Sequence, residues 1–409
     1  MVPNGWKLTS LGEVCSGNLQ TGPFGSQLHA HEYTDEGVPV LMPKDLINYR
    51  ANNATAAKIP EHRADDLKKH VLKSGDLLFS RRGDVARFAL IESDYPRSLC
   101  GTGCLKATPN KAHSPLFLSY FLQKNAVKKW LEQNAVGQTM PNMNTAILAE
   151  LPIMVASSRE EEDKIAKILS TWDKAIAATE KLIETSKQQK KALMQQLLTG
   201  KKRLVNPDTG KAFEGNWEQF SFGDVANISS KKHDPKKAST SVPCVELEHI
   251  KQESGGILGT ADSNDLASIK NRFTAGDVLF GKLRPYLKKY AFPSFDGVCS
   301  TEIWVLKAKK SIQPEYLYQF VQTNIFISEA NKSAGSKMPR ADWGVVSELI
   351  LKLPLLEEQK KITAVLDAAD KQLELLEAKL AHFKQEKKAL MQQLLTGKRR
   401  VKVDEMEVA

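Results

Sequence analysis

The sequence lacks the motifs that would give it chemistry of its own. It has no GxxxxGK[ST] phosphate-binding loop, so we expect no ATP hydrolysis by this chain. An adenine methyltransferase would carry an Asn/Asp-Pro-Pro-aromatic tetrad, and the nearest string, at 206–209, reads NPDT. Acidic clusters at 65–68 and 246–248 match the magnesium site of a nuclease only loosely, and His29 and His31 stand without a neighbouring cysteine that would indicate zinc. We therefore predict no catalytic residue, no metal ion and no cofactor in this chain.

Cysteine and long apolar runs are also scarce. The five cysteines are an odd number without a CxxC pair, which argues against a disulfide framework or a zinc ribbon and favours reduced, buried thiols. No run reaches the roughly 18 apolar residues of a membrane-spanning helix, and the first residues show no basic segment followed by an apolar one. The sequence thus predicts a cytoplasmic protein without membrane contact.

Size and positive charge are the first features that are present. A chain of 409 residues suits two or three domains. Its 58 lysines and arginines against 48 aspartates and glutamates give a net charge of +10, which favours a polyanionic partner. Nucleic acid is the first candidate.

An internal repeat organises the chain. The string KKALMQQLLTGK occurs at 190–201 and again, identical over twelve residues, at 387–398, an offset of 197. Backwards from there, more than forty residues are duplicated in register. The regions upstream match more weakly, as WKLTSLGEV at 6–14 and WEQFSFGDV at 217–225 show. The chain therefore alternates a variable region and a constant region, twice.

Each constant region predicts a long helix. Its stripe residues recur at alternating steps of four and three, from Ile165 to Leu197 and again from Ile362 to Leu394, without an intervening Pro or Gly. We expect the two stripes to pack against each other around a pseudo-two-fold axis, which makes the helices antiparallel. The predicted helix-pairing residues are Leu193, Leu197, Leu390 and Leu394.

The variable regions, about 1–155 and 205–353, predict mixed α and β structure. Short β-rich runs alternate with Gly, Pro, Asn and Asp turns. These runs lie at 38–42, 76–80, 87–91, 277–281 and 302–308, and helices are expected at 115–133 and 314–330.

Each variable region carries two polar loops suited to DNA. The first is basic and follows the shared GD-LF strand, and the second lies before the constant helix. Arg and Lys can donate to guanine O6 and N7 or to phosphate, while Gln and Asn pair with adenine N6 and N7. The candidate DNA contacts are Arg81, Arg82, Gln138 and Asn142 in the first region and Lys282, Arg284, Lys337 and Arg340 in the second. Solvated basic turns, or loops that have merely drifted apart, are the alternatives.

The layout and several strings resemble the DNA-specificity (S) subunit of bacterial type I restriction-modification systems, over essentially the whole chain. In the first half the resemblance rests on TGPFGSQL (21–28), GDLLFSRRGDVARFALI (75–91) and QTMPNMN (138–144). In the second half it rests on VPCVELEHI (242–250), GDVLFGKLRPYLKKYAF (276–292) and GSKMPRADW (335–343).

The resemblance implies an α+β fold with two globular target-recognition domains separated by two long antiparallel conserved helices, a coiled coil with a pseudo-two-fold internal repeat. The expected domains are a first target-recognition domain at 1–155, a central helix at 156–200, a connector and second recognition domain at 201–353, and a C-terminal helix and tail at 354–409. Each recognition domain would read one half of a bipartite, gapped site in double-stranded DNA, and the helices would act as a ruler.

The resemblance also implies partner subunits. These are two methyltransferase (M) subunits and two restriction/translocase (R) subunits, and S-adenosylmethionine, ATP and magnesium belong to them alone. Four glutamines at equivalent places, which suit contacts with two copies of one partner, are Gln195, Gln196, Gln392 and Gln393. Solubility of an exposed face is the alternative there. For the whole chain, the alternatives are a stand-alone enzyme, a coiled-coil adaptor that binds no DNA, and a system that only methylates.

Overall fold

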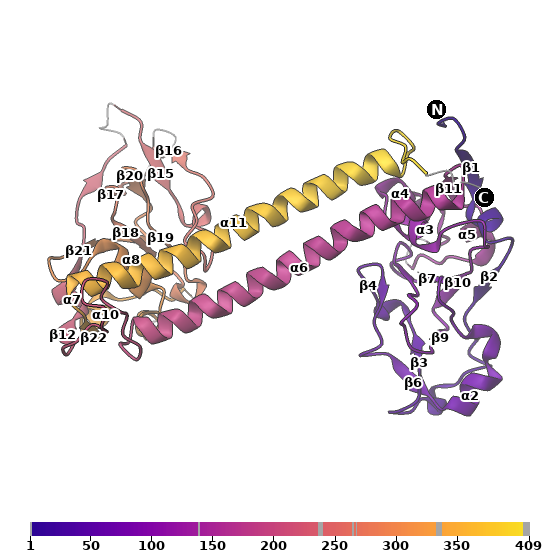
Figure 1. Cartoon of the computed structure of the whole chain (residues 1–409), viewed down its shortest axis with the longest axis horizontal. Helices are drawn as coiled ribbons and strands as arrows, with labels where there is room; N and C mark the ends of the chain where they lie inside the picture. The colour runs from indigo at the N-terminus through magenta and orange to yellow at the C-terminus, as the bar shows by residue number, and fades with distance from the viewer. Residues whose placement is uncertain are drawn as a thin grey trace. The chain divides into compact units, whose positions relative to one another are not determined.

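The computed structural model describes residues 2–137, 140–235, 240–263, 266, 268–332 and 338–403. The chain divides into two compact units: unit 1 comprises Met1–Thr179 together with Lys379–Ala409, and unit 2 comprises Glu180–Ala378. Each unit contains one domain of helices and sheets and part of two long helices, α6 (Arg159–Leu197) and α11 (Leu356–Leu394), which Figure 1 labels.

The domain of unit 1 is built on three sheets. A six-stranded sheet has the order β2-β10-β7-β8-β5-β4, a three-stranded sheet has the order β6-β3-β9, and β1 pairs with β11. The strands are β1 (Lys7–Ser10), β2 (Leu19–Thr21), β3 (Val38–Leu41), β4 (Leu46–Ile47), β5 (Arg50–Ala51), β6 (Ala57–Ile59), β7 (Leu77–Ser80), β8 (Phe88–Leu90), β9 (Leu99–Cys100), β10 (Cys104–Ala107) and β11 (Pro152–Val155). The helices are α1 (Leu11–Val14), α2 (Glu61–Asp66), α3 (Pro115–Leu122), α4 (Asn125–Asn134) and α5 (Thr145–Ala149).

The domain of unit 2 repeats this plan. A four-stranded sheet has the order β13-β21-β18-β19, a five-stranded sheet has the order β14-β17-β20-β15-β16, and β12 pairs with β22. The strands are β12 (Glu218–Ser221), β13 (Ala226–Ile228), β14 (Lys232–His233), β15 (Pro243–Val245), β16 (Ala261–Asp262), β17 (Lys270–Phe273), β18 (Val278–Gly281), β19 (Tyr290–Ala291), β20 (Gly297–Cys299), β21 (Ile303–Ala308) and β22 (Ile350–Leu353). The helices are α7 (Phe222–Val225), α8 (Pro314–Val321), α9 (Asn324–Ala330) and α10 (Trp343–Ser347).

Equivalent strands pair in the same sense in both domains. The antiparallel pair β7–β10 of unit 1 corresponds to β18–β21 of unit 2, and the parallel pair β3–β9 corresponds to β15–β20. Mostly antiparallel sheets with helices packed against them are an α+β architecture. The predicted fold class is confirmed.

One expected helix is two helices in each domain. The stretch expected as a single helix at 115–133 breaks at Gln123 between α3 and α4, and the stretch at 314–330 breaks at Gln322 between α8 and α9. No Gly or Pro marks either break. The turn lets α4 bury Val127 and Leu131 after α3 has buried its own apolar face, so packing overrides the local pattern.

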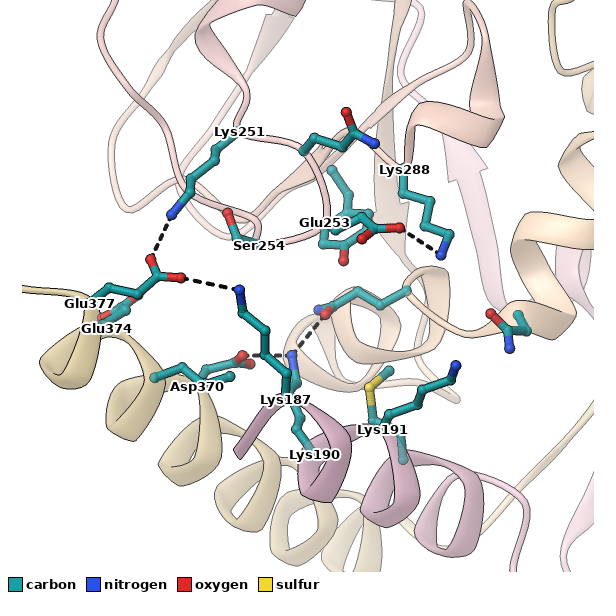
Figure 2. Close-up of a pocket in the computed structure, with 16 residues that line it drawn as sticks. Lys187, Lys190, Lys191, Lys251, Glu253, Ser254, Lys288, Asp370, Glu374 and Glu377 are labelled. Carbon is teal, nitrogen blue, oxygen red and sulfur yellow. Dashed lines mark hydrogen bonds and ion pairs between the residues drawn. The ribbon is translucent and has the colours of Figure 1, made fainter. Parts of the chain in front are cut away.

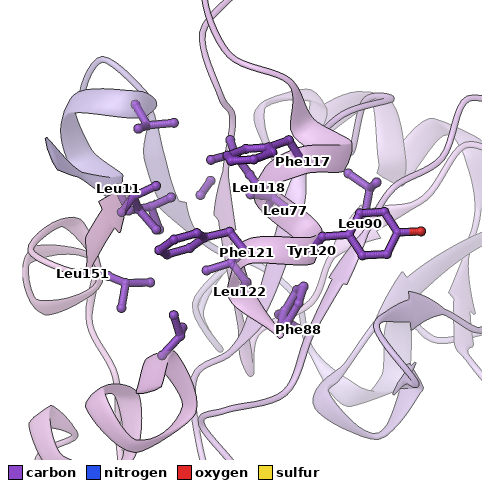
Figure 3. Packing of buried hydrophobic residues seen from close by; sticks show 14 of the residues in the cluster. Leu11, Leu77, Phe88, Leu90, Phe117, Leu118, Tyr120, Phe121, Leu122 and Leu151 are labelled. Atoms are coloured by element: carbon purple, nitrogen blue, oxygen red, sulfur yellow. The ribbon is translucent and has the colours of Figure 1, made fainter. Parts of the chain in front are cut away.

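The core of unit 1 joins the domain to both long helices. Leu77 and Phe88 of the sheet pack with Phe117 and Phe121 of α3, as Figure 3 shows. The same cluster includes Ile165, Ala166 and Leu169 near the start of α6. It also includes Leu394, the last residue of α11, and Leu395, which follows it. Leu394 and Leu395 therefore complete the core of unit 1.

The core of unit 2 likewise joins its domain to both long helices. Its core cluster combines Phe222 and Tyr316 of the domain with Leu197 and the following Leu198 at the end of α6, and with Ile362 and Leu366 from α11. Phe222, Phe280 and Phe326 form its aromatic centre, with ring centroids 5.0 Å apart in the pairs Phe222–Phe326 and Phe280–Phe326.

In each unit, an arginine–glutamate pair joins the segment that follows one long helix to the first turns of the other long helix. In unit 1 the Arg400 guanidinium donates to Glu161 through Nε at 2.5 Å and Nη2 at 2.8 Å, and in unit 2 Arg203 donates to Glu358 at 2.7 and 2.8 Å. Both carboxylate side chains are only 1% exposed. Burial raises the pKa of Glu161, but hydrogen bonds from Arg400 and Ser157 outweigh it and hold the pKa below its ordinary value.

A lysine–aspartate pair recurs in the same manner. Lys387 Nζ lies 2.5 Å from Asp173 Oδ1 in unit 1, and Lys190 Nζ lies 2.6 Å from Asp370 Oδ1 in unit 2. Asp370 and Lys387 stand 197 positions after Asp173 and Lys190, so the two contacts are copies of one another. Within each unit, the contact that lies further along the first partner segment lies earlier along the second: Glu161–Arg400 and Asp173–Lys387 in unit 1, and Lys190–Asp370 and Arg203–Glu358 in unit 2. The paired stretches are therefore antiparallel in each unit.

Candidate nucleic-acid interface

In unit 1 several loops meet at one end of the six-stranded sheet. The turn at 101–104 connects them: Gly22, just after β2, donates its N–H to the Cys104 carbonyl at 3.0 Å, and Arg81, just after β7, donates to the Gly103 carbonyl at 2.8 Å. A methyl group on Gly22 would lie 1.9 Å from a main-chain oxygen of this turn, so the approach requires glycine.

The two polar loops of the sequence form one site. Met143, in the loop before α5, donates its N–H to the Arg81 carbonyl at 2.8 Å. Arg82 and Asn142 pair in an isolated antiparallel β-bridge. The structure therefore brings together Arg81, Arg82 and Asn142, three of the predicted DNA contacts. The fourth, Gln138, lies outside the described residues.

Some polar atoms of this site have no hydrogen-bond partner among the described residues. Arg82 is exposed, and Arg81 and Asn142 are half-buried. Arg81 Nε and Asn142 Oδ1 are buried atoms that have no hydrogen-bond partner among the residues the structure describes. Buried polar atoms are rarely left in this state, which marks the junction of the two loops as a place where a polar ligand would complete the hydrogen bonding.

Unit 2 builds the same junction with other side chains. Ala341 donates its N–H to the Lys282 carbonyl at 2.8 Å, and Leu283 pairs with Arg340 in an isolated β-bridge. Arg340 Nε lies 2.9 Å from Glu302 Oε2, which fixes the guanidinium in one direction. Lys282 and Arg340 are thus brought together as predicted contacts, while Lys337 lies outside the described residues. Glu302 was not among the predicted site residues.

Only some of the cations after β18 remain available. Lys288 Nζ lies 2.8 Å from Glu253 Oε1, and Lys289 donates to the Leu247 carbonyl at 2.6 Å, so both hold the domain together. Within the part of the chain that the structure describes, the side chains of half-buried Lys282 and exposed Arg284 form no hydrogen bond or ion pair. These two cations are free to bind a polyanion.

The backbone at the tip of both loops is left-handed. Gly83 has φ +75° and donates its N–H to the Pro141 carbonyl at 3.1 Å. Arg284 occupies the equivalent position with φ +53° and donates to the Pro339 carbonyl at 2.7 Å. A left-handed conformation is costly for a residue with a Cβ, and strained residues of this kind gather at functional sites.

The predicted helix residues lie at the ends of α6 and α11. Leu197 and Leu394 are buried in the cores of units 2 and 1, and Leu193 and Leu390 pack half-buried against them. The four glutamines predicted to contact partners, Gln195, Gln196, Gln392 and Gln393, are exposed. Both assignments stay predictions.

Unit 2 also contains a charged cavity that the sequence did not reveal. It has a volume of about 360 Å³ and lies between α6, α11 and the loops of the domain. In Figure 2, Glu377 bridges Lys251 at 2.6 Å and Lys187 at 3.7 Å, while Lys190 pairs with Asp370. Lysines and carboxylates thus largely neutralise each other there. In the described ranges no three His, Cys, Asp or Glu side chains come together in a way that could hold a metal ion.

Two α+β domains with equivalent cationic loops suit a protein that binds a polyanion through both domains. The model of the type I restriction modification DNA specificity domain matches it twice, over residues 3–188 and 214–385. The chain belongs to this family, and the resemblance in the sequence is confirmed.

The chain is also similar to individual specificity subunits of type I restriction enzymes. The type I restriction enzyme EcoDI specificity subunit of Escherichia coli is 24% identical over 270 residues, which cover 59% of this chain and 60% of that protein. The putative type I restriction enzyme MjaX specificity subunit of Methanocaldococcus jannaschii is 25% identical over 431 aligned residues, which cover 98% of this chain and 95% of that protein.

Solved structures share the fold. The S subunit of a type I restriction-modification system from M. genitalium superposes with a TM-score of 0.61 at 16% identity, covering 96% of this chain and 97% of that one. A chain from a study of complex assembly and conformational transition of the type I R-M system gives 0.55 at 18% identity, covering 98% and 100%. Within the described residues, no helix combines the length and apolarity needed to cross a membrane.

Proposed function

We propose that this chain is the non-catalytic specificity subunit of a type I restriction-modification complex. Each target-recognition domain reads one half of a bipartite, gapped site in double-stranded DNA, and the paired helices set the spacer between the halves. The observation that carries the proposal is the doubled loop junction, because one backbone framework presents Arg81, Arg82 and Asn142 in unit 1 but Lys282, Arg284 and Arg340 in unit 2.

The side chains at each junction suit base reading. Arginine can donate two parallel hydrogen bonds to guanine O6 and N7, and asparagine pairs in two places with adenine. Because the two loops of each junction are hydrogen-bonded to one another, their side chains start from fixed backbone positions. Two junctions with different side chains would read two different half-sites, which is what a bipartite site requires.

The proposed partners follow from the same function. Two methyltransferase subunits dock on the helices near the exposed glutamines 195, 196, 392 and 393 and bring S-adenosylmethionine. Two restriction/translocase subunits bring ATP and magnesium, and the complex acts on DNA in the cytoplasm. This chain contributes recognition and no cofactor.

The decisive experiment is a genome-wide map of N6-methyladenine. The cognate methyltransferase subunit is expressed with and without this chain in a host that lacks other modification systems. A gapped, two-part methylated motif that appears only when the chain is present supports the proposal. No new methylation, with both proteins folded and copurifying, overturns it.

Single variants assign each half of the motif to a domain. Arg82→Ala should relax one position in one half, and Arg284→Ala should relax a position in the other half. Lys288→Ala is the matched control, because it removes a cation from the same loop as Arg284 but one that already pairs with Glu253. Relaxation of the same half by both test variants would contradict the assignment of one half-site to each domain.

A further inference from the structure

An exposed methionine stands at the same place in both junctions. Met140 is 65% exposed and Met338 is 51% exposed, and each is followed by a proline, Pro141 or Pro339. Single exposed apolar residues are common on protein surfaces. Here, however, the same residue recurs in both repeats, beside the loops that carry the free cations.

The backbone holds both methionines in a defined position. The carbonyl of each following proline accepts the N–H of the residue at the tip of the basic loop, Gly83 at 3.1 Å or Arg284 at 2.7 Å. Proline also fixes its own φ, which stiffens the turn. Each methionine therefore projects from a pinned turn next to cations that can anchor a phosphate backbone.

The residues around the methionines differ between the repeats. Asn142 of unit 1 is matched by Arg340 of unit 2, and Arg82 is matched by Leu283. Side chains that differ suit the reading of different base pairs. A methionine that stays the same suits a task that does not depend on which bases are present.

We propose that Met140 and Met338 are wedge residues that insert between adjacent base pairs, one in each half-site. The proposal rests on the proposed function, because it requires that both junctions face DNA. Apolar side chains, methionine among them, act as wedges by unstacking a base step and kinking the duplex, and the bend brings more DNA against the protein. The unbranched, flexible methionine side chain can enter a narrow gap between bases.

The test uses the chain copurified with its methyltransferase subunit and a duplex that carries the mapped site. 2-Aminopurine, whose fluorescence rises on unstacking, is placed in turn at each position except the methylated adenine. We expect a rise at one step in each half-site. Met140→Ala should abolish the rise in one half and Met338→Ala in the other, each with about tenfold weaker binding.

Two controls separate the wedge from general damage. Leu8→Ala and Leu258→Ala remove aliphatic side chains that are 56% and 70% exposed in the same units, and both should leave binding and fluorescence unchanged. An abasic site opposite the wedged step unstacks it in advance, so it should restore the affinity of the methionine variants.

The outcomes distinguish the two proposals. Site-specific binding with unchanged fluorescence and affinity in both methionine variants overturns the wedge and leaves the specificity function standing. An affinity loss that disappears when thymine is replaced by uracil also overturns it, because the methionines would then contact a thymine methyl group. Absence of any site-specific binding by the unaltered complex overturns both proposals.

Discussion

Arg284→Gly should change stability and DNA binding in opposite directions. The residue has φ +53°, a conformation that glycine adopts freely and that Gly83 already occupies in unit 1. A residue with a Cβ loses about 1–2 kcal/mol in the left-handed region, so removing the Cβ should stabilise unit 2 by about 1 kcal/mol. The guanidinium forms no hydrogen bond or ion pair with the described residues, so its removal costs the fold little.

The same substitution should weaken recognition. Loss of a base-reading arginine costs about 1–3 kcal/mol, which corresponds to about 5- to 150-fold weaker binding of the cognate site. Arg284→Ala is the matched control, because it removes the same guanidinium but keeps a Cβ at the strained position. Both variants should lose the same affinity, and only the glycine variant should gain stability.

Two measurements check this pair of expectations. Urea denaturation compares the midpoints of the two variants and of the unaltered chain, and a fluorescence anisotropy titration compares their affinities for the mapped duplex. A lower denaturation midpoint for Arg284→Gly than for Arg284→Ala would refute the inference that a Cβ at position 284 strains the backbone. Unaltered affinity in both variants would refute the role of Arg284 in recognition.

Three further predictions concern other parts of the chain. Gly22→Ala should lower the denaturation midpoint because its methyl group would lie 1.9 Å from a main-chain oxygen, while Gly25→Ala, with nothing within 4 Å, should leave the midpoint unchanged; equal effects would contradict this. Arg400→Met should lower the free energy of unfolding by about 1–2 kcal/mol, less than for a fully buried pair because the arginine is 44% exposed. The pKa of Glu161 is lower in the folded chain than in the unfolded chain, so ionised Glu161 stabilises the fold above the ordinary carboxyl pKa, and this stabilisation is lost as the pH falls through the lowered pKa. A denaturation midpoint that depends on pH as strongly in Arg400→Met as in the unaltered chain would contradict this. Arg82→Gln should leave the slope of log affinity against log salt unchanged, because an arginine that reads a base neutralises no phosphate; a slope reduced by about 1 would contradict base reading by Arg82.

The sequence was most informative where the signal is local or repeated. The helices α6 and α11 were expected from a long apolar stripe without Pro or Gly, and the repeat showed that there are two of them. The strand runs at 76–80 and 277–281 were expected from apolar segments between turns and correspond to β7 and β18. The breaks at Gln123 and Gln322 have no such signal, because packing of the following helix decides them.

The candidate site was predictable in composition and not in geometry. The basic loops were visible as residue types, but the contact between Arg82 and Asn142 joins segments 60 positions apart in the chain. Lys288 pairs with Glu253, whereas the Arg284 side chain has no partner among the described residues, and this distinction depends on where Glu253 lies in the fold. Neither follows from spacing, because each depends on tertiary contacts.

The discontinuous make-up of unit 1 has a consequence for synthesis on the ribosome. Leu394 and Leu395 belong to its core, and Arg400 donates to the Asn4 carbonyl at 2.7 Å as well as to Glu161. The domain of unit 1 therefore cannot finish folding until residues 394–400 have left the exit tunnel. A stop codon between positions 379 and 394 would damage unit 1, while unit 2, which comprises Glu180–Ala378, would keep all of its own residues.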